Sequence, residues 1–300
     1  MNLRKDILIF GEVLFDVFGA GEEKLGGAPF NVAWHLKGFG LDPLFISGIG
    51  QDKRGKRVLK LMTEWNMDKR GLYINEKSST GVVNVFIDKK GPIFDIPFGQ
   101  AFDHININDL SLFDITDIEP FLYHGSLALR SEENFNVLKS IKEMLSPEIF
   151  VDINLRTPWW KKEKVLKLIR EAKWLKLNDI EFNELFNSNI DKVVLSNICY
   201  HFGLDSIILT KGEEGAEIFA ETGCYLKAKN RVEKNIVDTV GAGDAFSAVF
   251  IYGLINKWDY NVALSRAVNF ATDICMIRGA LPSDIKFYKK HLDEWSKEDE

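Results

Sequence analysis

The chain has 300 residues, a formal net charge of −6 at pH 7 and a hydrophobic fraction of 46%. This length and composition are typical of an ordinary globular protein with a sizeable core. The negative charge balance repels polyanions, and no basic cluster with interleaved aromatic residues stands out, so nucleic-acid binding is not expected.

Segments for export or membrane insertion are not expected either. No stretch reaches the roughly 18 apolar residues that span a bilayer. Glu12 and Asp16 interrupt the apolar run near the N-terminus, which excludes a signal peptide. Cys199, Cys224 and Cys275 are widely spaced and form no CxxC pair, so we expect buried free thiols in a cytoplasmic protein.

The first elements alternate short apolar runs with helical patterns. Residues 7–10 predict a buried strand, and residues 13–18 predict a second strand or loop. A helix is expected at 30–37, a further strand at 44–49 and an amphipathic helix at 52–65.

The next region has a different pattern. Short β-rich runs at 81–87 and 92–97 flank a turn at 88–91, as in a hairpin. We therefore predict a small β-rich lid, formed by inserted segments at roughly 12–25 and 72–98. The lid is a candidate surface for homodimerisation, although a monomer is equally compatible.

From residue 121 onward strands alternate regularly with helices. This alternation predicts an α/β fold in one domain, residues 1–300, with a mostly parallel sheet covered by helices on both faces. The strands are expected at 121–125, 149–153, 174–177, 207–210, 216–219 and 224–227, and the helices at 131–145, 161–172, 180–186, 192–202, 242–255, 260–277 and 284–295.

The segment with the clearest chemistry is Gly241-Ala242-Gly243-Asp244, where three small residues lead into an apolar helix. Small residues let a ligand approach the backbone, and the unpaired amides at a helix start bind anions. Asp244 beside them could take a proton from an attacking hydroxyl during phosphoryl transfer.

Simpler interpretations of these glycines remain open. Residues 241–243 could form only a turn, with Asp244 capping the helix. A dinucleotide-binding loop would need a third glycine and an earlier position in the chain. The segment 50–57 matches GxxxxGK but ends in Arg57, where a phosphate-binding loop needs Ser or Thr, so we interpret it as structural.

Two motifs carry a resemblance to a known family. The segment 238–244, DTVGAGD, resembles the second signature of the PfkB (ribokinase-like) carbohydrate kinases, and the segment 26–33, GGAPFNVA, resembles the first. Both stand in the order typical of the family, and the resemblance covers nearly the whole chain. It implies a ribokinase-like three-layer sandwich that transfers a phosphoryl group from ATP to a sugar hydroxyl.

The resemblance also implies roles for individual residues. Asp244 would be the general base, residues 241–243 the anion hole, and Arg156, in a D-x-N-x-R segment, a ligand of phosphate oxygens. The sugar site would be formed by Asp16, Gly26, Gly27 and Asn31.

For the nucleotide and its ions, the resemblance implies three groups. Asn178 and Glu181, in an N-x-x-E motif, would place Mg²⁺ through water. Asp238, Val240 and Gly279 would hold a monovalent cation such as K⁺, although the loop 278–282 is one residue shorter than is typical of the family. The ATP site would be completed by Thr210, Lys211, Gly212, Gly215, Gly243 and Asn269.

The substrate is indicated less directly. The segments 122–129 and 152–156, with Trp159 and Trp160, resemble bacterial fructokinases, which makes the 6-hydroxyl of D-fructose the leading acceptor. Gln100, just after the lid, could also face the sugar. Ribose, 2-keto-3-deoxygluconate and a nucleoside remain alternatives, and a sugar phosphate ranks lower. A catalytically inactive sugar- or nucleotide-binding regulator is the alternative outside enzymes, and a nicotinamide oxidoreductase is a third possibility.

Overall fold

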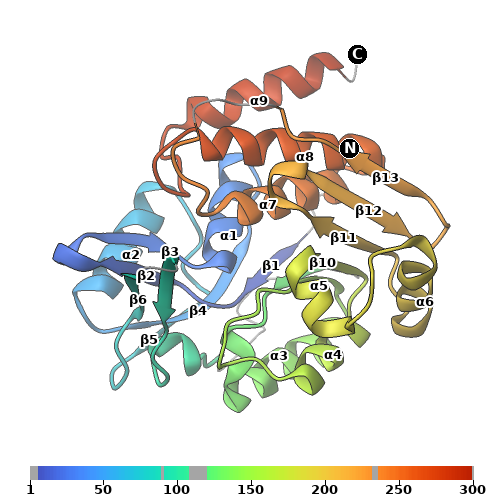
Figure 1. Cartoon of the computed structure of the whole chain (residues 1–300). Coiled ribbons are helices and arrows are strands. Elements are labelled where there is room, and N and C mark those ends of the chain that lie inside the picture. Colours follow the sequence, from blue (N-terminus) through green and yellow to red (C-terminus); the bar gives the residue numbers. More distant parts are fainter. Residues whose placement is uncertain (1–5, 89–90, 108–119, 232–235, 299–300) are drawn as a thin grey trace.

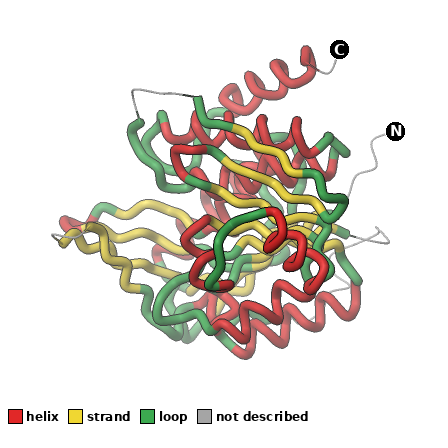
Figure 2. The backbone as a smooth tube through the Cα atoms, turned by 45° about the vertical axis from the view of Figure 1, so that its right-hand side comes forward, coloured by secondary structure: helices red, strands yellow, loops and turns green. Residues whose placement is uncertain are grey.

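The computed structural model describes residues 6–88, 91–107, 120–231 and 236–298. Its centre is a nine-stranded sheet (Figures 1 and 2). Seven of its strands pair in parallel, and the two strands at one edge, β12 (Ala216–Ala220) and β13 (Tyr225–Ala228), pair antiparallel with their neighbours. In spatial order the strands are β13 (Tyr225–Ala228), β12 (Ala216–Ala220), β11 (Ser206–Thr210), β10 (Trp174–Asn178), β9 (Glu148–Asp152), β8 (Phe121–His124), β1 (Ile7–Phe10), β4 (Leu44–Gly50) and β5 (Leu72–Asn75).

Helices cover both faces of this sheet because its strands are apolar on both sides. In β1, Ile7 and Ile9 pack into one core, and Leu8 and Phe10 pack into the other. The predicted three-layer α/β architecture is thereby confirmed (Figure 1). The first core is covered by α1 (Ala28–Gly38), α2 (Lys53–Glu64), α7 (Ala242–Ile255), α8 (Tyr260–Cys275) and α9 (Ile285–Glu298), and the second by α3 (Glu132–Leu145), α4 (Lys162–Arg170), α5 (Asp179–Phe186) and α6 (Lys192–Phe202).

The lid is a separate four-stranded sheet beside the main body, at the left of Figure 1. Its strands are β3 (Glu23–Gly26), β2 (Leu14–Phe18), β6 (Gly81–Asp88) and β7 (Gly91–Asp95). The lid contains less of the segment 72–98 than the sequence predicts, because β5 (Leu72–Asn75) pairs with β4 in the main sheet. Lys89 and Lys90 of the expected turn lie outside the described residues. Phe86 and Phe94 are about half exposed on the lid, and dimerisation through it stays a prediction.

A buried arginine fastens the end of the lid to the body. The Arg130 guanidinium donates to both Asp103 carboxylate oxygens, at 2.7 and 2.8 Å, and to the carbonyl of Pro97 at 2.6 Å. Gln100 lies in the same region, where its side-chain amide donates to the carbonyls of Val82 and Pro97. Its amide oxygen accepts from the Val82 N–H. Gln100 therefore connects β6 to the segment that follows β7, and it is not among the residues that line the cleft.

The structure also shows where the cysteines and the segment 50–57 lie. Cys199 is buried, but Cys224 is exposed at the turn between β12 and β13, so the expectation of three buried thiols is wrong there. Asp52 caps α2 by accepting from the Gly55 N–H at 2.8 Å, which agrees with a structural role for the segment 50–57. Among the described residues, no helix has the length and apolar character needed to cross a bilayer.

Candidate active site

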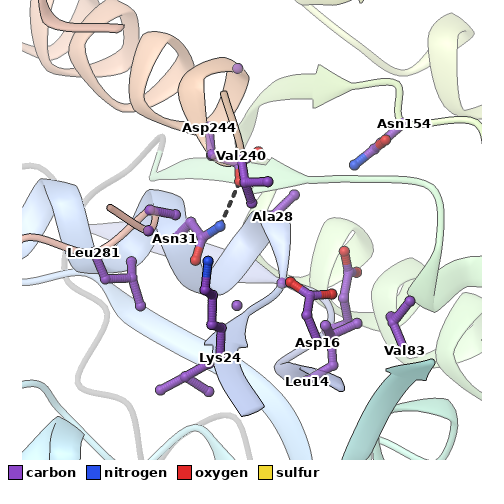
Figure 3. Close-up of a pocket in the computed structure, with 18 of the residues that line it drawn as sticks. Leu14, Asp16, Lys24, Ala28, Asn31, Val83, Asn154, Val240, Asp244 and Leu281 are labelled. Carbon is purple, nitrogen blue, oxygen red and sulfur yellow. Dashed lines mark hydrogen bonds between the residues drawn. The ribbon is translucent and has the colours of Figure 1, made fainter. Parts of the chain in front are cut away.

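A cleft of about 920 Å³ lies between the lid and the carboxyl ends of the central strands. Asp152, Asn178 and Thr210 are the last residues of β9, β10 and β11, and all three line it. Ligands of open α/β sheets bind at this edge of the sheet. Figure 3 shows side chains of the lid, of α1 and of the start of α7 directed into one space.

The start of α7 offers free backbone donors to this cleft. Gly241 precedes the helix in the left-handed conformation, with φ of 81°. A Cβ at this position would lie 2.3 Å from the Cβ of Ala280, so glycine is required. The N–H groups of Gly241, Gly243 and Asp244 have no hydrogen-bond acceptor among the described residues. Such amides at a helix N-terminus form an anion site.

Ala242 contributes less than expected to this anion site. Its N–H donates to the carbonyl of Thr239 at 3.3 Å, and Ala242 is not among the residues that line the cleft. The predicted anion hole is therefore formed by the amides on either side of it.

Asp244 joins the anion site to the wall of the cleft formed by Glu12, by Asp16 on β2 and by the start of α1. The sequence predicts the sugar at this wall, which we call the acceptor wall. The Oδ2 atom of Asp244 accepts a 2.6 Å hydrogen bond from Nδ2 of Asn31 on α1 (Figure 3). Burial raises the pKa of Asp244 to about 6, and the Asn31 hydrogen bond opposes that rise. The group is therefore mostly ionised at neutral pH and remains basic enough to accept a proton.

The acceptor wall continues along β2 and the turn before α1. Asp16 lies opposite Lys24 in the β2–β3 pair, and a Cβ on Gly26 would lie 3.5 Å from the Asp16 carboxylate. Gly27 has φ of 109° and caps α1, and a Cβ there would lie 2.6 Å from the carbonyl oxygen of Glu12. Gly27 thus allows the backbone to turn closely around the pocket, whereas a Cβ on Gly26 would make only an ordinary contact with Asp16. Burial raises the pKa of Asp16 to about 6.

Glu12 is a buried carboxylate of this wall to which sequence reasoning gave no role. It is 3% exposed, lines the cleft, and its Oε2 has no hydrogen-bond partner in the described structure. Burial raises its pKa to about 7, and the nearby Asp244 carboxylate adds to the rise. The sequence signal was a glutamate directly after a fully apolar strand.

A buried network of charged and polar side chains connects β9 and β10 to the first turns of α7. The Lys176 ammonium donates to both carboxylate oxygens of Asp152, at 2.8 and 3.0 Å. Tyr123 and Ser247 also donate to this carboxylate, at 3.1 and 2.7 Å. Burial alone would lower the pKa of Lys176, but the Asp152 carboxylate outweighs it and raises the pKa above its ordinary value. Lys176 also lines the cleft, 3.4 Å from the position of a Cβ on Gly243.

The expected Mg²⁺ pair forms a capping box at the start of α5. Asn178 Oδ1 accepts from the Glu181 N–H at 2.8 Å, and Glu181 Oε2 accepts from the Asn178 N–H at 2.9 Å. The other Glu181 oxygen accepts from the Leu155 N–H at 3.0 Å. Burial raises the pKa of Glu181. Glu181 and Asn178 both line the cleft, and a carboxylate beside an amide fits a hydrated Mg²⁺ held through water.

Arg156 is exposed at the rim of the cleft. Its contact to the Leu155 carbonyl is long, 3.5 Å, and it forms no ion pair with the described residues. Its guanidinium is therefore available to an incoming anion.

Several residues expected at the nucleotide lie outside the residues that line the cleft. The Lys211 ammonium pairs with Glu217 at 2.8 Å, and Gly212 and Gly215 form the tight turn that follows β11. Asn269 is exposed on α8. Thr210 alone of the expected β11 loop lines the cleft.

The predicted cation residues do come together. Asp238 accepts from the Val240 N–H at 3.1 Å and from the Gly279 N–H at 3.3 Å. The ammonium of Lys24, on the lid, lies 3.4 Å from the same carboxylate. No group of three or more His, Cys, Asp or Glu within the described ranges could hold a metal by itself.

An open α/β sheet, free amides at a helix start and a carboxylate with a raised pKa beside them meet the requirements of phosphoryl transfer. The family model described as pfkB family carbohydrate kinase matches residues 6–283. The chain belongs to this family, and it is a carbohydrate kinase of ribokinase-like fold.

The relatives with assigned names are kinases named for sugars or for a sugar phosphate. An uncharacterized sugar kinase of Pyrococcus horikoshii is 29% identical over 268 residues, which cover 83% of this chain and 82% of the relative. An ATP-dependent 6-phosphofructokinase of Thermoanaerobacterium thermosaccharolyticum is 26% identical over 291 residues, or 91% and 88% of the two chains. Other relatives, 24% to 28% identical, are named as fructokinases of plants and bacteria.

Among solved structures, a fructokinase double mutant of Vibrio cholerae superposes with a TM-score of 0.80. It covers 96% of this chain and 99% of its own at 22% identity, and its crystal contains fructose, ADP and a potassium ion. At this identity the likeness establishes the fold.

Proposed function

We propose that this kinase transfers the γ-phosphoryl group of ATP to the 6-hydroxyl of D-fructose, with Asp244 as general base. The observation that carries the proposal is the position of Asp244. Its carboxylate lies within hydrogen-bond distance of Asn31 in the acceptor wall and directly at the free amides of α7. An acceptor hydroxyl and a transferred phosphate can therefore meet at this one residue.

The charge of the acceptor wall supports a neutral polyol. Glu12, Asp16 and Asp244 line this part of the cleft, and carboxylates accept hydrogen bonds from sugar hydroxyls. The same carboxylates repel a sugar acid or a sugar phosphate. Of the cations that line the cleft, Lys24 pairs with Asp238 and Arg57 with Glu23. Arg156 also lines the cleft, and we assign it to the transferred phosphate and not to the acceptor.

In the proposed reaction the acceptor hydroxyl oxygen forms a bond to the γ-phosphorus in line and gives its proton to an Asp244 carboxylate oxygen. The bond between the γ-phosphorus and the β,γ-bridging oxygen breaks, and ADP leaves. The amides of Gly241 and Gly243 and the Arg156 guanidinium stabilise the charge on the transferred oxygens, and this positioning and neutralisation is the main source of catalysis in phosphoryl transfer. Asn178 and Glu181 would hold a hydrated Mg²⁺, which neutralises phosphate charge when bound.

A coupled assay for ADP release with a panel of acceptors tests the proposal. The panel comprises fructose, ribose, 2-keto-3-deoxygluconate, fructose 6-phosphate and adenosine, and we expect the highest kcat/KM for fructose. Phosphorus NMR of the product should locate the phosphate at position 6. A higher kcat/KM for another acceptor would identify that acceptor as the preferred substrate in place of fructose. Sugar binding without any ADP release would favour the inactive regulator.

A further inference from the structure

Two ion pairs connect the lid to the loops around the start of α7. Lys24 on β3 lies 3.4 Å from Asp238, and Glu22 lies 2.9 Å from Arg278. The Lys24 and Asp238 side chains are 29% and 16% exposed, whereas those of Arg278 and Glu22 are 73% and 51% exposed. Solvent screens the Glu22–Arg278 pair more strongly, so the Lys24–Asp238 pair is the more important contact.

The partner of Lys24 is the carboxylate that holds two loops together. Asp238 Oδ1 accepts from the Val240 N–H, and Oδ2 accepts from the Gly279 N–H. Gly279 precedes Ala280, against which Gly241 packs. Asp238 therefore fixes the backbone that carries the anion hole, and its negative charge needs compensation at the edge of a site for polyanions.

We propose that the Lys24 ammonium supplies this compensation in place of a monovalent cation. Asp238, Val240 and Gly279 are the residues for which family resemblance implies such a cation. In this chain a positive group already lies at the Asp238 carboxylate, so an added cation would meet like charge and would have to displace it. The three residues therefore do not fit an alkali cation while the lid holds Lys24 in place.

The side chain of Lys24 is well supported in this position. In Figure 3 it extends from the lid toward Asn31 and the start of α7. Its ammonium lies 5.3 Å from the centre of the Phe18 ring, a cation–π contact within the same lid. Asp16 lies directly opposite Lys24 in the strand pair and adds a second negative neighbour. These groups keep the ammonium at the cleft without help from a bound ion.

The inference concerns the nucleotide side of the proposed site, so it does not depend on which sugar is phosphorylated. The test compares wild type with Lys24→Met, which keeps an unbranched side chain on Phe18. Binding of ADP by calorimetry and the melting temperature are measured in potassium chloride and in tetramethylammonium chloride at equal ionic strength. Arg278→Gln, which breaks the neighbouring lid contact but leaves Asp238 intact, is the matched control.

We expect wild type and Arg278→Gln to bind ADP equally well in both salts. Lys24→Met should lose about two- to fivefold in ADP affinity in tetramethylammonium, in line with the loss of one partly exposed ion pair, and potassium should restore it. The inference is overturned if potassium tightens ADP binding to wild type as much as to Lys24→Met. If none of the proteins binds ADP, the kinase proposal fails, but the inference about Lys24 can still be tested by the melting temperatures. It then requires that potassium raise the melting temperature of Lys24→Met and leave that of wild type unchanged.

Discussion

Asp244 combines two properties that a general base needs at neutral pH. Burial raises its pKa to about 6, so the carboxylate is ionised at pH 7 and binds a proton more strongly than an ordinary aspartate. Because the ionised form is the active one, kcat/KM should fall about tenfold per pH unit below pH 6 and level off above it. Initial rates at low substrate between pH 5 and 8 would measure this limb. A profile flat down to pH 5 would contradict the assignment.

Replacing the base should separate catalysis from binding. Asp244→Asn keeps the shape of the side chain and an oxygen that can accept from Asn31. We expect it to fold and bind ADP like wild type while turnover falls by about 10² to 10⁴, the usual contribution of general-base catalysis. The residual kcat/KM of Asp244→Asn should also no longer fall as the pH drops below 6. Turnover within a few-fold of wild type would remove Asp244 from this role.

Sequence reasoning found the site residues that stand in motifs and missed those that act through burial. Asp244 and Asn31 belong to recognisable segments, and the structure brings them together. Lys176 and Glu12 belong to no motif considered, although a lysine within an otherwise apolar parallel strand is unusual. Gln100 was placed at the sugar because it follows the lid, but its hydrogen bonds go to the lid backbone.

The turn that leads into α7 depends on a glycine. A Cβ at Gly241 would collide with Ala280, and φ of 81° is unfavourable for any other residue. Gly223 has a similar φ of 85°, but a Cβ there would meet nothing within 4 Å. We expect Gly223→Ala to cost only the backbone strain, about 1–2 kcal/mol of unfolding free energy, with normal kcat.

Gly241→Ala should cost more than this control and should also weaken ADP binding, because the amides of the anion site must shift. Denaturant unfolding and calorimetry on both variants provide the comparison. Equal losses of stability with unchanged ADP affinity would show that the contact with Ala280 does not position the helix start.

Breaking the buried ion pair between Asp152 on β9 and Lys176 on β10 should be strongly destabilising. Lys176→Met leaves the Asp152 carboxylate buried at 3% exposure without its cation, which should cost about 3–5 kcal/mol of unfolding free energy. Adding Asp152→Asn removes the unpaired charge, so the double variant should recover much of that stability. A double-mutant cycle from urea unfolding measures the coupling. Additive losses would mean that the two groups do not interact.

The order of elements was largely predictable, because the alternation of apolar strands and amphipathic helices follows directly from burial on both faces of a parallel sheet. The assignment of β5 was not predictable in this way. Leu72–Asn75 is a short strand next to the lid segments in sequence, and only its pairing with β4 places it in the main sheet. Pairing between strands distant in sequence is not encoded in local pattern.

Across the whole molecule, several cleft carboxylates have raised pKa values. Glu12 rises from 4.5 to about 7, and Asp16 and Asp244 rise from 3.8 to about 6. Between the ordinary and raised values the folded protein binds more protons than the unfolded chain. The free energy of unfolding contributed by these groups therefore falls as pH rises from about 4 to 7.

Glu12→Gln tests this dependence because the neutral amide removes the cost of a buried ionised group. The variant should melt at a higher temperature than wild type at pH 8, and the difference should shrink toward pH 5, where Glu12 is already protonated. Thermal melts in a pH series give the result. A stability difference that is independent of pH would indicate that Glu12 has the same pKa in the folded and the unfolded protein, so that burial does not raise it.

The hydrogen bond between Asn31 and Asp244 spans 213 positions of the chain. The phosphate-binding helix and the acceptor wall thus come from opposite ends of the polypeptide. During synthesis on the ribosome, the emerging N-terminal portion would carry half of a reaction centre and no turnover. In a refolding experiment, enzymatic activity would accordingly appear only after this long-range contact has formed.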